Sequence, residues 1–147
     1  MLKRVAMSAV AVGAAAVVWT GAASGATGSQ QFRISATNSG GTVYASGPIS
    51  GSGRDVPLNQ NADKFVFANG WVLVSHHATS QNQTFDPRSC LGRFTESGTY
   101  SLVKGAGAYK GVTGSGTYTA RGTSRGCDPN SAPSRYFVQA SGWTNLP

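Results

Sequence analysis

Apolar and polar residues alternate along most of the chain after residue 26, a spacing that is typical of strands with one buried face. In one such segment, Phe32, Ile34 and Ala36 alternate with polar residues. Apolar residues spaced three and four apart, as on one face of a helix, are absent beyond the first 26 residues. The pattern therefore predicts an all-β domain.

Seven segments show strand-like alternation: 31–37, 42–53, 63–68, 71–79, 91–103, 114–123 and 135–143. The polar, turn-rich segments 54–62 and 81–90 are predicted as loops. The dipeptide Asn69-Gly70 is a strong signal for a tight hairpin. An antiparallel meander of seven or eight strands leaves exposed edges unless it closes on itself. We therefore expect an antiparallel up-and-down β-barrel of about eight strands.

Glycines are interleaved with Tyr, Val and Thr in the segment 105–118, which reads GAGAYKGVTGSGTY. Glycine tolerates tight turns and close backbone approach, whereas Tyr, Val and Thr favour strands. The segment is predicted as a tight turn that leads into a long, bent strand at a barrel corner. It lacks the Gly-Lys-Ser/Thr of a phosphate loop and the third glycine of a dinucleotide motif, so no cofactor is expected.

The segment 94–100 (FTESGTY) and the glycine segment 105–118 together resemble the allene oxide cyclase and dirigent group of calycin-like β-barrels. They are most similar to small secreted actinobacterial members of that group. The resemblance implies a barrel of about eight strands. The plant cyclase is an isomerase and dirigent proteins orient radical coupling, but no catalytic set of either can be matched here, so neither activity is carried over.

The first 26 residues have the layout of a secretory signal peptide, with Lys3 and Arg4 ahead of an Ala- and Val-rich stretch. The small residues Ser24 and Ala26 predict cleavage after Ala26; cleavage after Ala23 and an uncleaved membrane anchor are the alternatives. After cleavage, residues 27–147 would form one secreted, extracellular domain without stable membrane insertion.

Cys90 and Cys127 are the only cysteines, and in an exported chain such a pair predicts a disulfide. Each lies near an Asp-Pro turn, so we expect a bridge between two surface loops. The chain has no C-x-x-C and no cluster of histidines that would complete a zinc site, so no metal is expected.

The formal net charge is +7, and removal of the leader leaves ten basic and five acidic residues. The basic residues are scattered, which favours solubility and weak attraction to anionic surfaces. A nucleic-acid groove would need clustered basic and aromatic residues, so no nucleic-acid partner is expected. The oligomeric state is not indicated.

Glu96 is the first candidate catalytic residue, because alternation places it on the same strand face as Phe94 and Tyr100. A carboxyl group in an apolar lumen would have a raised pKa and could exchange protons. The alternative is an outward or rim position beside an arginine. His76 and His77 are adjacent, so only one of them can face the interior, and that histidine could pair with Glu96.

Tyr100, Trp71 and Phe67 are candidate ligand-binding residues, although aromatic residues of this kind are also common in barrel cores. The first functional hypothesis is a non-enzymatic secreted or envelope-associated module that binds a small apolar or amphipathic ligand. The second is an isomerase or cyclase-like enzyme acting on an apolar substrate, with Glu96 and one of the two histidines steering protons.

Overall fold

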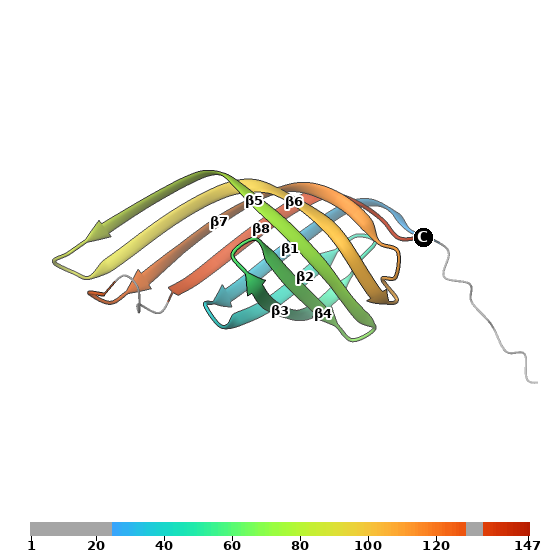
Figure 1. The fold of residues 1–147 in the computed structure, drawn as a ribbon, viewed down its shortest axis with the longest axis horizontal. Helices are drawn as coiled ribbons and strands as arrows, with labels where there is room; N and C mark the ends of the chain where they lie inside the picture. Colours follow the sequence, from blue (N-terminus) through green and yellow to red (C-terminus); the bar gives the residue numbers. More distant parts are fainter. Residues whose placement is uncertain (1–24, 129–133) are drawn as a thin grey trace, which may run out of the picture.

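Eight antiparallel strands, hydrogen-bonded in chain order, close into a barrel in which β1 also pairs with β8 (Figure 1). The computed structural model describes residues 25–128 and 134–147, and these residues contain no helix. The strands are β1 (Thr27–Thr37), β2 (Gly40–Ser46), β3 (Gly51–Asn59), β4 (Ala62–Phe67), β5 (Gly70–Asp86), β6 (Leu91–Gly107), β7 (Thr113–Arg125) and β8 (Ser134–Asn145). The predicted all-β, up-and-down barrel is thereby confirmed.

Alternation along each strand decides which side chains enter the barrel. Phe32, Ile34 and Ala36 of β1 are buried in the core, whereas their neighbours in the chain are exposed. The β1–β8 ladder that closes the barrel runs from Thr27 opposite Asn145 to Thr37 opposite Arg135. The inward rows of all strands build one continuous apolar core.

Two segments that were predicted as loops lie mostly in strands of the structure, and one segment that was predicted as a single strand is divided between two. The segment 42–53 is interrupted after Ser46 and resumes as β3 at Gly51, and β3 continues to Asn59 through residues predicted as a loop. This polar segment is extended because it pairs with β2 on one side and β4 on the other. A ladder on both sides outweighs the low strand propensity of its residues.

The other predicted loop, 81–90, belongs mostly to β5, which runs on to Asp86 and pairs with β6 along its whole length. Thr79 is an extra residue on β5 between the pairs Ala78–Gly98 and Ser80–Ser97, and forms a bulge there. Beyond this bulge, β5 and β6 project past the short hairpins of β1–β4 as a long ribbon (Figure 1). The side chains of β5 within this ribbon are exposed to solvent, and most of them are polar.

The glycine segment forms the predicted turn, between β6 and β7. Gly107 and Gly111 have positive φ angles of 66° and 79°, which glycine adopts without steric cost. The turn carries Tyr109 and Val112 into the core, where the Tyr109 ring meets the Phe67 ring edge-on at 5.5 Å between centroids. These buried side chains fill this end of the barrel.

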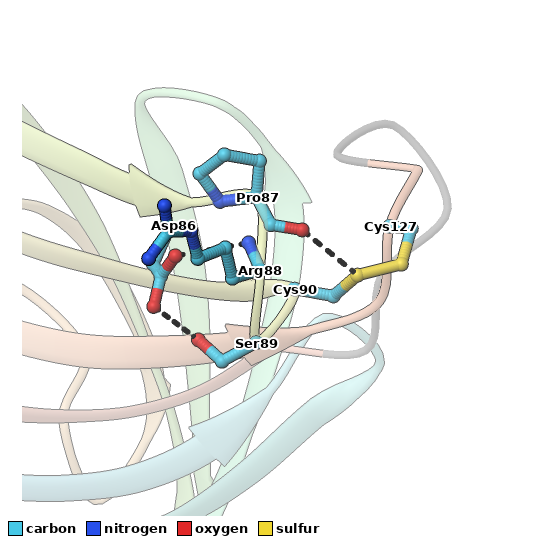
Figure 2. Close-up of a disulfide and its surroundings, with 6 residues drawn as sticks. All are labelled: Asp86, Pro87, Arg88, Ser89, Cys90 and Cys127. Atoms are coloured by element: carbon cyan, nitrogen blue, oxygen red, sulfur yellow. Dashed lines mark hydrogen bonds between the residues drawn. A yellow bond between two sulfur atoms is a disulfide. The ribbon is translucent and has the colours of Figure 1, made fainter.

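The predicted bridge between Cys90 and Cys127 is present and joins the turn before β6 to the loop after β7 (Figure 2). The Asp86 carboxylate accepts hydrogen bonds from the Arg88 amide at 2.9 Å and the Ser89 hydroxyl at 2.7 Å, which shape the turn. The Gly126 amide donates a hydrogen bond of 2.9 Å to the Cys90 carbonyl. This hydrogen bond prolongs the β6–β7 ladder up to the disulfide.

The predicted signal peptide lies almost entirely outside the described residues, which begin at Gly25. Within the described part of the chain, no helix has the length and apolar character needed to cross a bilayer.

Candidate functional site

A cavity of about 270 Å³ lies inside the barrel, toward the end that carries the β3–β4 turn. Its walls come from β1 and from β3 through β8. At about 30 Å³ per water molecule, the space corresponds to roughly nine waters. The apolar part of the wall consists of aliphatic and phenylalanine side chains: Phe32, Ile34, Phe65, Val74, Phe94, Ala120, Val138 and Ala140.

Asp55 is the most deeply buried acidic group of the cavity. It projects from β3, is 3 % exposed, and its Oδ1 atom has no hydrogen-bond partner in residues 25–128 and 134–147. Burial, reinforced by the nearby Asp63 carboxylate and opposed by His76, raises the pKa of Asp55 from 3.8 to about 7. This carboxyl group can therefore gain or lose a proton near neutral pH.

Asp63 and His76 form an ion pair on the same side of the cavity. The His76 Nε2 atom lies 3.1 Å from Oδ2 of Asp63, and both side chains are partly buried. The hydrogen bond to Asp63 raises the pKa of His76, against the opposing effect of burial. The pair holds the imidazole edge-on to the Tyr118 ring, with 5.8 Å between the ring centroids.

Glu96 lines the cavity and is half-buried. Its Oε1 atom accepts a hydrogen bond of 2.6 Å from the Tyr118 hydroxyl, and its Oε2 atom accepts one of 2.7 Å from the Gln81 amide. Burial and the Glu96 carboxylate raise the pKa of Tyr118 well above its ordinary value. The phenol thus stays protonated and holds the carboxylate in place.

Two further tyrosines line the cavity. The Tyr100 hydroxyl is buried and finds no hydrogen-bond partner in the described part of the chain, and burial raises the pKa of this phenol. Its ring packs edge-on against Phe32 at 5.9 Å between centroids and lies close to Gly116, where a Cβ atom would collide with the ring. Burial, followed by the charges of Asp55 and Asp63, raises the pKa of Tyr136 to about 12.

Of the predicted site residues, Glu96, His76 and Tyr100 come together at the cavity, whereas His77, Trp71 and Phe67 lie elsewhere. His77 is exposed because His76 occupies the inward position of the alternation. Trp71 lies beneath the Lys64 ammonium, 4.6 Å from the ring centroid. Phe67 fills the closed end beside Tyr109.

The sequence reasoning missed Asp55, Asp63 and Tyr118. A signal for Asp63 was available, because alternation places it with the buried Phe65 and Phe67. Tyr118 likewise shares its strand face with Gly116 and Ala120. Asp55 could not be found in this way, because its segment was predicted as a loop and has no apolar alternation.

Among the described residues, no three His, Cys, Asp or Glu side chains are placed to share a metal ion. The cavity instead combines an apolar wall with a carboxyl group and a phenol that lack partners. Small-molecule sites typically have this composition, with a few polar groups that orient a mostly apolar ligand. No family model, curated protein or solved structure matches this chain.

Proposed function

We propose that this protein is a secreted or envelope-associated binding module that holds one small amphipathic molecule in its barrel lumen. The observation that carries the proposal is a cavity of about 270 Å³ that has an apolar wall and two buried polar atoms without a hydrogen-bond partner among the described residues. A buried polar group without a partner is costly, and a ligand that supplied the missing hydrogen bonds would offset that cost.

Export is proposed on two grounds. Residues 1–26 have the sequence pattern of a cleavable leader, and Cys90 and Cys127 form a disulfide, a bond that persists mainly in oxidising compartments. The disulfide also rigidifies the end of the β6–β7 ladder, on two of the strands that line the cavity.

Native mass spectrometry of the protein, purified with its disulfide intact from its natural source, tests the proposal. We expect a chain that starts at Thr27 and carries a small non-covalent molecule. A mature chain that never retains or takes up a small molecule would contradict lumen binding and direct attention to the outer surface. A chain that retains its first 26 residues would contradict cleavage. In that case the presence or absence of a bound small molecule in the same spectrum would still decide whether the lumen holds a ligand.

An isomerase-like enzyme is the second candidate, and the ionisable groups of the lumen favour it. Asp55 can exchange a proton near neutral pH, and Glu96 is held by Tyr118 within the same cavity. The sequence resemblance to the allene oxide cyclase group also agrees with this candidate. It predicts that Glu96→Gln abolishes conversion of the recovered ligand while leaving the melting temperature nearly unchanged. Equal conversion by Glu96→Gln and the wild type would exclude this role of Glu96.

A further inference from the structure

The acidic residues of this basic chain are concentrated in the cavity. The whole chain has only five Asp and Glu residues against twelve Lys and Arg, yet three of the five line the lumen: Asp55, Asp63 and Glu96. No Lys or Arg is found among the described residues that line this cavity. The single base there, His76, is paired with Asp63. The lumen is therefore electronegative inside a protein of opposite net charge.

One of these carboxyl groups lacks a hydrogen-bond partner within the part of the chain that the structure describes. Asp63 is paired with His76, and Glu96 accepts hydrogen bonds from Tyr118 and Gln81. Asp55, by contrast, is 3 % exposed and its Oδ1 atom meets no donor. An ionised carboxylate in such a position is costly unless a cation or several donors approach it. His76 attracts the Asp55 carboxylate but is itself paired with Asp63, so a positively charged ligand group would supply a direct partner.

The rest of the wall also suits a cation on an apolar body. In the wall of the cavity, the Phe32 ring packs against the Phe65 ring at 5.4 Å and against the Tyr100 ring at 5.9 Å between centroids. The face of an aromatic ring carries partial negative charge and attracts ammonium groups within about 6 Å. An aromatic or aliphatic ligand body would pack against the same rings.

We propose that the lumen selects a small organic cation, an ammonium group attached to an aromatic or other compact apolar body. This inference rests on the proposed function, because it names the ligand class of the same cavity. The ammonium group would lie against Asp55, and the apolar body against the phenylalanine side of the wall. A metal cation is a poor fit, since no three potential ligands among the described residues converge.

An anionic ligand is the competing possibility. A wide, open depression of about 800 Å³ shares Phe94 and Tyr136 with the cavity and is also lined by Arg93, Arg121 and Arg135. These arginines are exposed and alternate with the inward-facing residues of β6, β7 and β8. They therefore lie outside the lumen, where solvent screens their charge.

Three probes of nearly the same size and shape separate these possibilities: benzylammonium, benzyl alcohol and benzoate. Isothermal titration calorimetry of the oxidised protein at pH 8 is expected to give a dissociation constant for benzylammonium at least tenfold lower than for benzyl alcohol. Benzoate is expected to bind most weakly, because the lumen carboxylates repel it. Asp55→Asn should weaken benzylammonium binding about tenfold and leave benzyl alcohol unchanged.

Asp86→Asn is the matched control, because it removes the same charge from an exposed turn and retains the side-chain oxygen that accepts from Arg88. It should leave the affinity for all three probes unchanged. Equal binding of benzylammonium and benzyl alcohol would overturn the cation inference and leave lumen binding intact. Tightest binding of benzoate would overturn it in favour of the arginines. Failure of all three probes to bind would count against both the cation inference and the proposed function.

Discussion

Replacing both cysteines with serine is expected to lower the free energy of unfolding by about 4 kcal/mol. The bridge joins residues 37 apart in sequence, and a cross-link of that span removes many conformations from the unfolded chain. In the folded state the bridge lies at the end of a ladder that already pairs Leu91 with Arg125, so its loss should leave the barrel topology unchanged. Chemical denaturation of the double variant, followed by tryptophan fluorescence, measures the difference.

Ser89→Ala is the control for this prediction, because it removes a side chain from the same turn without opening the bridge. It deletes one exposed hydrogen bond to Asp86 and is expected to cost less than about 1 kcal/mol. If the double cysteine variant and the wild type unfold at the same denaturant concentration, the bridge does not restrict the unfolded chain as argued.

Between pH 4 and pH 8 the wild-type protein is expected to lose stability, by at most about 4 kcal/mol, through the ionisation of Asp55. The pKa of this group is about 7 in the folded protein, against an ordinary value of 3.8 for an aspartate side chain. In this interval the folded state therefore holds a proton that the unfolded chain has released, and stability falls as the pH rises. The raised pKa of His76 acts in the same direction at higher pH.

Asp55→Asn should remove most of this decline, because the amide does not ionise. Urea denaturation of both proteins at pH 4, 6 and 8 gives the comparison, and each protein serves as its own reference across the pH range. Asp86→Asn is the control. Hydrogen bonds from Ser89 and Arg88 lower the pKa of the Asp86 carboxyl group, so removing this group should not reduce the loss of stability between pH 4 and pH 8. An unchanged decline in Asp55→Asn would show that Asp55 is not the destabilising group.

The barrel could be predicted from sequence because its core rows follow the rule of alternation. Phe32, Ile34 and Ala36 are apolar and inward, and the turns at 69–70 and 105–112 carry glycines where the backbone bends. The bridge between Cys90 and Cys127 followed from the cysteine count and the expected export. The strands and turns depend on residues that are close in sequence, and two cysteines allow only one disulfide.

The polar lumen could be predicted only in part. Glu96 lies in a strand whose apolar neighbours reveal its direction, and the structure places it at the cavity. Asp55 lies in a strand without a regular row of apolar residues, and the neighbouring strands bring Gly41 and Phe65 opposite it. Tertiary pairing of this kind leaves no local pattern in the sequence. Asp55 was missed for that reason, whereas alternation could have indicated Asp63.

The measurement that tests the lumen site most directly is native mass spectrometry of the wild type beside two phenylalanine variants made in the same host. Ala140 lines the cavity between its cross-strand neighbours Phe32 and Tyr118, so Ala140→Phe should place a phenyl ring in the lumen and obstruct the ligand. Ser141→Phe adds the same side chain at an exposed neighbouring position. We predict a bound small molecule on the wild type and on Ser141→Phe, and none on a folded Ala140→Phe. Equal retention by all three proteins would place the ligand outside the lumen and contradict the account.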